Sequence, residues 1–210
     1  MKIVSLQVAQ LRPLKIGSRL TQTGHFKEPV SGPVSLDREG LAGDAIGNHK
    51  HHGGPDQAVY LYSAEDYAWW QHRLGQELPN GTFGENVTLE CLPPAFRLGD
   101  VWNLGPVQLQ VTGPRIPCST LAARMKLPKF VKEFAAANRG GAYARVLTPG
   151  LLKVGQELTV DPYPHPAPTV DAIFELWHQA DKDPDLMRLA LTTPLASRAR
   201  AALEYWLSKA

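Results

Sequence analysis

Alternation of apolar and polar residues predicts several short strands before residue 160. Near the start of the chain, Val4, Leu6 and Val8 alternate with Ser5 and Gln7, which is the period of a half-buried strand. Similar β-rich patterns occupy residues 58–62, 101–111, 144–147 and 157–160. Many short strands separated by turn residues, with two or three inserted helices, predict a mainly β fold with α, built as an antiparallel β-barrel.

Two segments inside this β-rich part have helical patterns instead. Ser63 is a good N-cap, apolar residues continue at helical spacing to Leu74, and Gly75 is suited to end the helix. A second apolar stripe begins at residues 130–134 and stops at the glycine pair 140–141. We therefore expect these helices as insertions between strands.

The composition changes sharply near residue 160. All eighteen glycines lie at or before Gly155, and residues 161–168 place proline at every second position, as in a stiff extended linker. Beyond this segment, helical patterns begin near Val170, at the Asp183 cap with its following proline, and near Ala196. The last part of the chain is therefore expected to form three short helices.

The length of the chain, 210 residues, allows one sizeable core with an appendage. We expect residues 1–162 to form the β-barrel domain and residues 163–210 to form a small three-helix extension. Trp177 and Trp206 are large apolar residues of that extension, and we expect one of them to dock it on the body.

Charge and cysteine usage exclude several classes of protein. The net charge of +2 is small and spread along the chain, which argues against a basic patch for nucleic acid. Two cysteines are too few for a disulfide framework, and we expect Cys91, between Leu89 and Leu92, to pack in the core. No stretch approaches the ~18 apolar residues of a membrane span, and residues 1–8 lack signal-peptide features. These features predict a cytoplasmic protein without nucleic-acid or membrane partners.

Residues 113–118, Gly-Pro-Arg-Ile-Pro-Cys, present a thiol on a stiff loop just before a segment that can start a helix. Pro114 and Pro117 fix their φ angles, so the side chain of Cys118 leaves the loop in a defined direction. Arg115 favours the thiolate, which is the form that binds metals and attacks electrophiles. The alternative is a buried structural cysteine, because free cysteines are among the most buried residues.

A second candidate lies at residues 49–54, His-Lys-His-His-Gly-Gly. Imidazole can donate a hydrogen bond to an anion or coordinate a metal, and glycine lets the backbone approach a ligand closely. The spacing does not match a usual zinc site, and an exposed polar loop is the structural alternative. His52 and Gly53 are therefore candidates for binding an anion or a cofactor.

Polar residues also gather at residues 82–86, where Glu85 accepts hydrogen bonds and Asn86 both donates and accepts them. Such a pair can bind the edge of a heterocycle, although this turn and Asp44 are equally explained by local backbone hydrogen bonds. Arg145, inside an apolar strand, requires either a carboxylate in the core or an anionic ligand. Together with the thiol, these groups suit a phosphorylated heterocyclic cofactor that carries a thiophilic metal.

Five short motifs cover most of the first 160 residues. They occupy residues 43–44, 52–60, 83–88, 114–118 and 141–150. In these motifs and their order the chain resembles the MOSC domain family, named for the C-terminal domain of molybdenum cofactor sulfurases, and most closely its bacterial YiiM-like branch. The helical tail resembles the three-helix extension of that branch. The departures are Ser119 and Thr120, where many relatives carry a bulky residue and a lysine, and Cys91, where many have glycine.

The resemblance implies a β-barrel that holds molybdenum cofactor (molybdenum–molybdopterin), with Cys118 as catalytic residue and thiolate ligand to molybdenum. It also implies two-electron reduction of N-hydroxylated small molecules, such as hydroxylaminopurines and related hydroxylamines, to amines. The chain has neither a four-cysteine iron–sulfur motif nor a dinucleotide fingerprint, so we expect electrons to come from a separate reductase.

The resemblance also implies roles for the other motif residues. The positions matched to the cofactor site are Asp44, His52, Gly53, Phe83, Gly84, Glu85, Asn86, Arg115 and Arg145. Arg115 and Arg145 are assigned to the phosphate or pterin, because guanidinium binds phosphate well. Glu85 and Asn86 are assigned to the pterin edge. His52 is assigned to an anion or to an oxo group of the metal.

Two other classes of function remain open. A non-catalytic carrier would bind the cofactor or a sulfur species in the same pocket and pass it to a partner enzyme. A cysteine hydrolase would use Cys118 with a histidine from residues 49–52, which requires contact between thiolate and imidazole. Turnover of a hydroxylamine with an artificial reductant separates the reductase from the carrier, and the position of the histidines tests the hydrolase.

Overall fold

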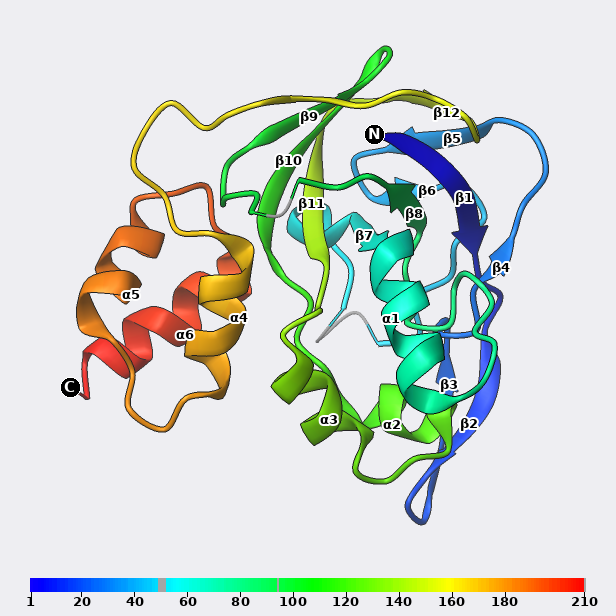
Figure 1. Ribbon diagram of the computed structural model, residues 1–210, viewed down its shortest axis with the longest axis horizontal. Helices are drawn as coiled ribbons and strands as arrows, with labels where there is room; N and C mark the ends of the chain where they lie inside the picture. The colour runs from blue at the N-terminus through cyan, green and yellow to red at the C-terminus, as the bar shows by residue number, and fades with distance from the viewer. Residues whose placement is uncertain (49–51, 94, 210) are drawn as a thin grey trace.

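The computed structural model describes residues 1–48, 52–93 and 95–209. His49, Lys50 and His51, which belong to the predicted histidine loop, lie outside the described residues. Figure 1 shows a curved sheet with the first three helices beside it and the helices that follow residue 169 grouped at one end.

An eight-stranded sheet forms the body of the described chain (Figure 1). In spatial order its strands are β13 (Thr159–Asp161), β9 (Val101–Leu104), β10 (Val107–Pro114), β11 (Ala142–Thr148), β7 (Val59–Ser63), β8 (Val87–Glu90), β1 (Lys2–Val8) and β4 (Glu28–Pro29). The smaller sheets are β12 (Gly150–Leu152), β5 (Val34–Asp37) and β6 (Gly40–Leu41), and the hairpin β2 (Arg12–Ile16) with β3 (Arg19–Thr23). All of these pairs are antiparallel except β7 with β8, which is parallel.

The predicted mainly β fold with helices is confirmed, with one refinement that concerns the barrel. Across the described ranges, the strand ladders of the main sheet end at β13 and β4 and do not close into a continuous barrel. Ile3 instead exchanges backbone hydrogen bonds with Gly155 and Gln156. The start of β1 therefore meets the segment that leads into β13, and the curved sheet is joined through a loop.

The six α-helices of the described residues agree with the sequence patterns. They are α1 (Ala64–Leu74), α2 (Ser119–Met125), α3 (Phe130–Ala137), α4 (Val170–His178), α5 (Pro184–Leu191) and α6 (Ser197–Leu207), and a short 3-10 helix, η1, spans Pro55–Gln57. Ser63 accepts a hydrogen bond from the Asp66 amide, and Gly75 ends α1 with a φ of 63°. Asp183 caps α5 in the same way.

An aromatic cluster packs α1 and α3 against the sheet. It consists of Tyr62, Tyr67, Trp70, Phe83, Phe130 and Phe134. The ring centroids of Phe83 and Tyr62 are 4.8 Å apart, and those of Phe83 and Tyr67 are 4.9 Å apart. Close tilted contacts of this kind add to the stabilisation that burial of the rings provides. Phe83 is fully buried, so the cluster supplies a rigid apolar floor beneath the cavity described below.

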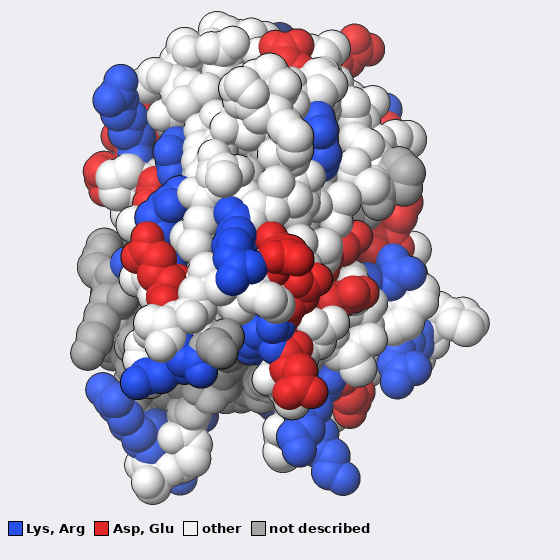
Figure 2. Space-filling model, turned by 90° about the vertical axis from the view of Figure 1, so that its left-hand side faces the viewer, with Lys and Arg blue, Asp and Glu red and all other residues white. Residues whose placement is uncertain are grey.

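The C-terminal helices pack on the sheet through α4, which contacts β10. The Phe174 ring of α4 lies 6.4 Å from that of Phe134, whereas Trp177 and Trp206 pack on each other at 4.9 Å within the helical group. Figure 2 shows basic and acidic residues side by side on the face that carries α5 and α6. None of the helices in the described part of the chain is both long and apolar enough to cross a bilayer.

Two sequence predictions about individual residues are wrong. Cys91 is exposed rather than buried, because it occupies a turn with a φ of 59° in which its amide donates to Glu65. This conformation suits glycine, which the resemblance places there in many relatives. Ser5 and Gln7 are buried on the second face of β1, where the Gln7 amide donates to Thr88 Oγ1 at 2.9 Å.

Candidate functional site

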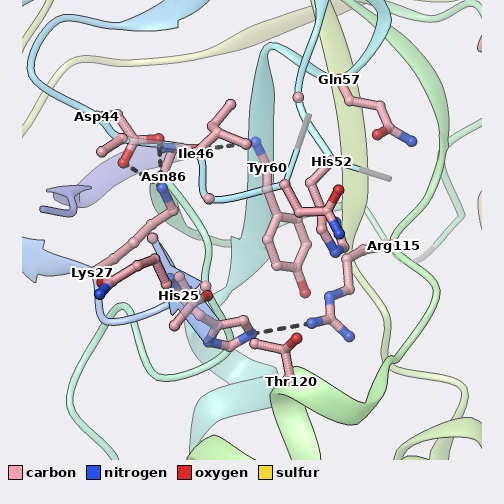
Figure 3. Close-up of a pocket in the computed structure, with 18 of the residues that line it drawn as sticks. His25, Lys27, Asp44, Ile46, His52, Gln57, Tyr60, Asn86, Arg115 and Thr120 are labelled. Atoms are coloured by element: carbon pink, nitrogen blue, oxygen red, sulfur yellow. Dashed lines mark hydrogen bonds and ion pairs between the residues drawn. The ribbon is translucent and has the colours of Figure 1, made fainter. Parts of the chain in front are cut away.

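A cavity of about 280 Å³ opens beside the β2–β3 hairpin and the start of α2 (Figure 3). Glycine makes this arrangement possible, because a Cβ on Gly24 would collide with the carbonyl of Ala45 on the facing segment. The polar side chains that line the cavity include His25, Lys27, Asp44, His52, Asn86 and Arg115. Figure 3 shows His52 and Arg115 at one end and Asp44 with Asn86 at the other.

Cys118 is the N-cap residue of α2 and is not itself among the described residues that line the cavity. Its neighbours Arg115, Ser119 and Thr120 line the cavity, and its thiol is free and half-buried. The extended backbone of Cys118, with a φ of −134° and a ψ of 170°, matches the stiff loop predicted from the two prolines. His52, which precedes η1 in the chain, is one of the groups that lower the pKa of this thiol.

The surroundings of Cys118 favour its thiolate. Burial alone would raise the pKa of the thiol, but the hydrogen bond with His52 and the positive charge of Arg115 outweigh burial and lower the pKa to about 6. Burial raises the pKa of Tyr143, which also lines the cavity, so its phenol stays neutral. Cys118 is therefore mainly a thiolate at pH 7, the form that ligates a soft metal or attacks an electrophile.

Arg115 is a buried cation with one unused donor. Its side chain is 2 % exposed, and its guanidinium lies 5.9 Å from the Tyr60 ring centroid and 5.7 Å from that of Phe134. Nη2 contacts His25 Nε2 at 3.2 Å, whereas Nη1 has no hydrogen-bond partner within the described residues. A buried guanidinium nitrogen rarely lacks an acceptor, so Nη1 beside a cavity indicates a site for an anion.

His25 acts as the acceptor that orients Arg115. Burial, followed by the charges of Arg115 and Lys27, keeps the pKa of His25 well below the usual value, so the imidazole is neutral. Because guanidinium has no acceptor, Nε2 of His25 accepts and Nδ1 carries the proton. That Nδ1 is buried and has no partner among the residues described. Gly84 permits this packing, because a Cβ there would lie 3.0 Å from the imidazole.

A polar network forms the other wall of the cavity. The Lys27 ammonium pairs with Asp44, and both side chains are 8 % exposed. Asp44 also accepts from Asn86 Nδ2 at 2.8 Å, and Asn86 Oδ1 accepts from the Tyr60 amide at 3.1 Å. Asp44 and Asn86, two of the residues assigned to the cofactor, thus line the cavity, but their polar atoms are engaged with each other and with the backbone. The network fixes the shape of the wall.

His52 is held by a glycine-rich turn. Gly53 has a φ of 69°, and a Cβ on it would lie 2.3 Å from Ile46 Cδ1, so a larger residue does not fit without movement. The His52 amide donates to the Asn48 carbonyl at 3.0 Å. Gly53 and Phe83 both line the cavity, as the motif matching predicts.

Two of the predicted cofactor residues, Glu85 and Arg145, are engaged elsewhere in the structure. Glu85 is fully buried, and its Oε1 accepts from Tyr67, Thr88 and the Gly81 amide. Arg145 pairs with a carboxylate rather than facing the cavity: its Nη2 lies 2.9 Å from Asp56 Oδ1. Neither is among the described residues that line the cavity.

Sequence reasoning missed His25 and Lys27. Both lie in the connection from β3 to β4, where no apolar alternation or known spacing distinguished them. The feature of the sequence that could have pointed to His25 was the preceding Gly24, because a glycine permits close approach of two backbones.

Comparison with known proteins places the chain in a family. The family description "MOSC domain" matches residues 48–159, which is more than half of the chain. The chain belongs to the MOSC domain family. The match includes His52, Asn86, Arg115 and Cys118, so most of the site lies inside the family domain.

Individual members of the family are similar over most of the chain. Protein YflK of Bacillus subtilis (strain 168) is 35% identical over 157 residues, which are 74% of this chain and 71% of YflK. A protein named "Reductase" from Gibberella moniliformis is 29% identical over 78% of this chain, but the match covers 30% of that longer protein. The crystal structure of YiiM from Geobacillus stearothermophilus superposes with a TM-score of 0.81 at 29% identity and covers 98% of both chains.

The donor set of the cavity fits the cofactor type of this family. Molybdenum cofactor combines a thiophilic metal with an anionic phosphate and a heterocycle. Cys118 offers a thiolate, and Arg115 Nη1 and His25 Nδ1 are buried donors without partners in the described part of the chain. A soft ligand beside unsatisfied donors is the combination that such a group requires.

Alkylation of Cys118 by iodoacetamide is expected to titrate with a pKa of about 6 in the cofactor-free protein. The thiolate is the reactive form, so the rate should rise through that pH and level off above pH 7. Rates at a series of pH values, followed by mass spectrometry in a Cys91→Gly background, measure this directly. Cys91→Gly removes the exposed thiol and suits the positive φ at that position.

His52→Phe is the matched variant, because it removes the hydrogen bond and keeps an aromatic ring. We expect it to move the midpoint towards the usual cysteine value of about 8.5. A midpoint near that value in the Cys91→Gly protein itself would contradict the described arrangement.

Proposed function

We propose that this chain binds molybdenum cofactor through Cys118 and reduces N-hydroxylated compounds, such as hydroxylaminopurines and related hydroxylamines, to the amines. The observation that carries the proposal is the free thiol of Cys118 at the N-cap of α2, three residues after Arg115, whose buried Nη1 lacks a partner among the described residues and which lines the polar cavity. Family membership supports a molybdenum-cofactor-type domain. When bound, the cofactor supplies two-electron redox chemistry, and a separate reductase delivers the electrons.

The residues of the chain bind and orient in this proposal. Cys118 ligates molybdenum through its sulfur, and His52 holds that sulfur in place. Arg115 Nη1 and His25 Nδ1 donate to anionic or acceptor groups of the cofactor, which satisfies both buried atoms. Asn86 shapes the wall that the cofactor faces, together with the ion pair of Lys27 and Asp44.

Turnover with an artificial reductant tests the proposal. Protein from a host that makes molybdenum cofactor is expected to convert a hydroxylamine to the amine with a reduced viologen dye. The same chain from a host without cofactor synthesis should give only the uncatalysed rate. The Cys91→Gly variant is the control for the second thiol and should retain activity, because Cys91 is exposed in a turn away from the cavity lining. Molybdenum-loaded protein without turnover would indicate a carrier instead.

One observation favours a second candidate, a cysteine hydrolase. Such an enzyme requires a thiolate beside an imidazole, and His52 is one of the groups that lower the pKa of Cys118. Hydrolysis of p-nitrophenyl esters by cofactor-free protein tests it, since a hydrolase needs no molybdenum. Ester turnover that disappears in both Cys118→Ala and His52→Phe would support the hydrolase over the reductase.

A further inference from the structure

We propose that a basic surface beside the cavity docks an acidic electron-transfer protein, which delivers the electrons that the proposed reduction consumes. This inference rests on the proposed function and deepens it, because it names the kind of partner and the surface that receives it. The surface is formed by the β2–β3 hairpin and by residues 119–132, which include α2 and the start of α3. It is called the basic face below.

Basic residues gather in these two segments, and acidic residues are missing from both. Residues 12–23 and 119–132 contain seven of the 22 lysines and arginines of the chain and none of its 20 aspartates and glutamates. The seven are Arg12, Lys15, Arg19, Arg124, Lys126, Lys129 and Lys132. All except Arg124 are exposed, and within the described ranges only Arg12 forms an ion pair, with Glu28. The chain as a whole is nearly neutral, but the fold gathers an excess of positive charge here.

The two segments are far apart in sequence but lie together in the fold. Helix α2 packs against β2, and Figure 1 shows the hairpin, α2 and α3 at the same lower end of the molecule. Figure 2 shows several basic side chains projecting at this lower end. Burial, joined by the positive charge of Arg12, lowers the pKa of Arg124, so charges from the two segments act on each other. Their combined field attracts a surface of negative charge.

The basic face borders the cavity in which the proposed reaction takes place. Ile16 and Arg19 of the hairpin and Ser119 and Thr120 of α2 line that cavity. Reduction of a hydroxylamine breaks the N–O bond, takes up two electrons and two protons, and releases the amine and water. The chain has no iron–sulfur or dinucleotide motif, so the two electrons have to come from another protein. A donor bound to the basic face would lie next to the cavity.

Exposed leucines accompany the charges of the basic face. Leu20, near the tip of the hairpin, is 69 % exposed and pairs across the hairpin with Lys15. Leu11, directly before Arg12, is 46 % exposed. Protein interfaces combine apolar contacts with a polar rim, and electron-transfer complexes are small interfaces in which charge steers the encounter. Leucines among unpaired cations beside a redox cavity therefore fit an acidic protein better than a nucleic acid, which is bound mainly through its phosphates.

Binding of a plant-type ferredoxin, a small acidic electron carrier, tests the proposal by calorimetry without any turnover. The double variant Lys126→Glu with Lys129→Glu reverses two exposed charges of the basic face. We expect it to weaken binding by at least about tenfold at low ionic strength, and salt should weaken binding to the parent in the same direction. Lys153→Glu with Lys209→Glu is the matched control and should bind as the parent does. It lowers the net charge equally at two exposed lysines, one after β12 and one after α6, away from the hairpin in Figure 1.

Turnover with two donors separates this inference from the proposed function. With reduced ferredoxin, the rate of hydroxylamine reduction should fall by about tenfold in Lys126→Glu with Lys129→Glu. With a reduced viologen dye, which needs no docking surface, the rate of this variant should equal that of the parent. Absence of turnover with the dye would reject the proposed function, whereas the binding measurement would still decide whether the basic face docks an acidic protein.

Three results would overturn the docking proposal. They are no binding of ferredoxin by the parent, equal binding by the parent and by the variant with both glutamates, and tighter binding to phosphatidylserine vesicles than to ferredoxin with the same loss in that variant. The last result would assign the basic face to a lipid surface. If the variant does not fold, Lys126→Gln with Lys129→Gln takes its place, and binding equal to that of the parent rejects the proposal.

Discussion

Replacing Arg115 by methionine is expected to remove most of the bound molybdenum and to make Cys118 a weaker acid. Methionine keeps an unbranched side chain beside Tyr60 and Phe134 but removes the charge that lies over both rings and favours the thiolate. We expect the pKa of Cys118 to rise by about 1. Groups that support a metal ligand typically contribute 10–100-fold to metal affinity, so molybdenum content should fall by at least about tenfold.

The pKa of His25 is also expected to change in the Arg115→Met variant. The charge of Arg115 is one cause of its low pKa, so removal of that charge raises the pKa of His25. Its Nε2 also loses the guanidinium that it faces. NMR titration of the imidazole measures this change in pKa.

Molybdenum analysis and the pH dependence of alkylation measure the effect of Arg115→Met. Arg73→Met is the control, because Arg73 also lies over an aromatic ring, 5.6 Å from the Trp69 centroid, but is exposed. Arg73→Met should have the same molybdenum content and the same pH dependence of Cys118 alkylation as the parent protein. Parent levels of molybdenum in Arg115→Met would contradict the assignment of its free nitrogen to the cofactor.

Glu85→Ala is expected to destabilise the fold strongly without removing a group that contacts the cofactor. The substitution leaves the hydroxyl groups of Tyr67 and Thr88 and the Gly81 amide without their buried acceptor. A buried donor left unpaired costs ~1–3 kcal/mol, so the free energy of unfolding should fall by about 3–5 kcal/mol. Glu85 joins α1, the turn before β8 and β8 itself, and these elements separate more easily without it.

Urea denaturation followed by tryptophan fluorescence measures this loss. Glu28→Ala, which removes an exposed partner of Arg12, is the control and should leave the midpoint nearly unchanged. A small effect of Glu85→Ala on the free energy of unfolding, combined with loss of molybdenum, would instead support Glu85 as a cofactor-binding residue.

The helices of this fold could be predicted closely, because their ends carry local signals. Ser63, Gly75 and Asp183 act at their predicted positions through contacts with residues a few places along the chain. The parallel pairing of β7 with β8 could not be predicted in this way. It depends on the crossover through α1, and β8 has only four residues from which to recognise a strand.

The candidate site could be predicted only in part, because motifs give residue types but not the direction of side chains. Asn86 lines the cavity while Glu85, its neighbour, is buried against Tyr67 of α1. Arg145 was ambiguous from sequence, and its partner Asp56 lies 89 positions away, which no local pattern reveals. His25 became recognisable only when folding brought it to Arg115.

The central claim is that the sulfur of Cys118 holds the metal, and elemental analysis of Cys118→Ala tests it most directly. Protein purified from a host that makes molybdenum cofactor should contain about one molybdenum per chain, both in the parent and in Cys91→Gly. Cys118→Ala, with an unchanged melting temperature, should contain almost none. Molybdenum at the parent level in Cys118→Ala would contradict the account.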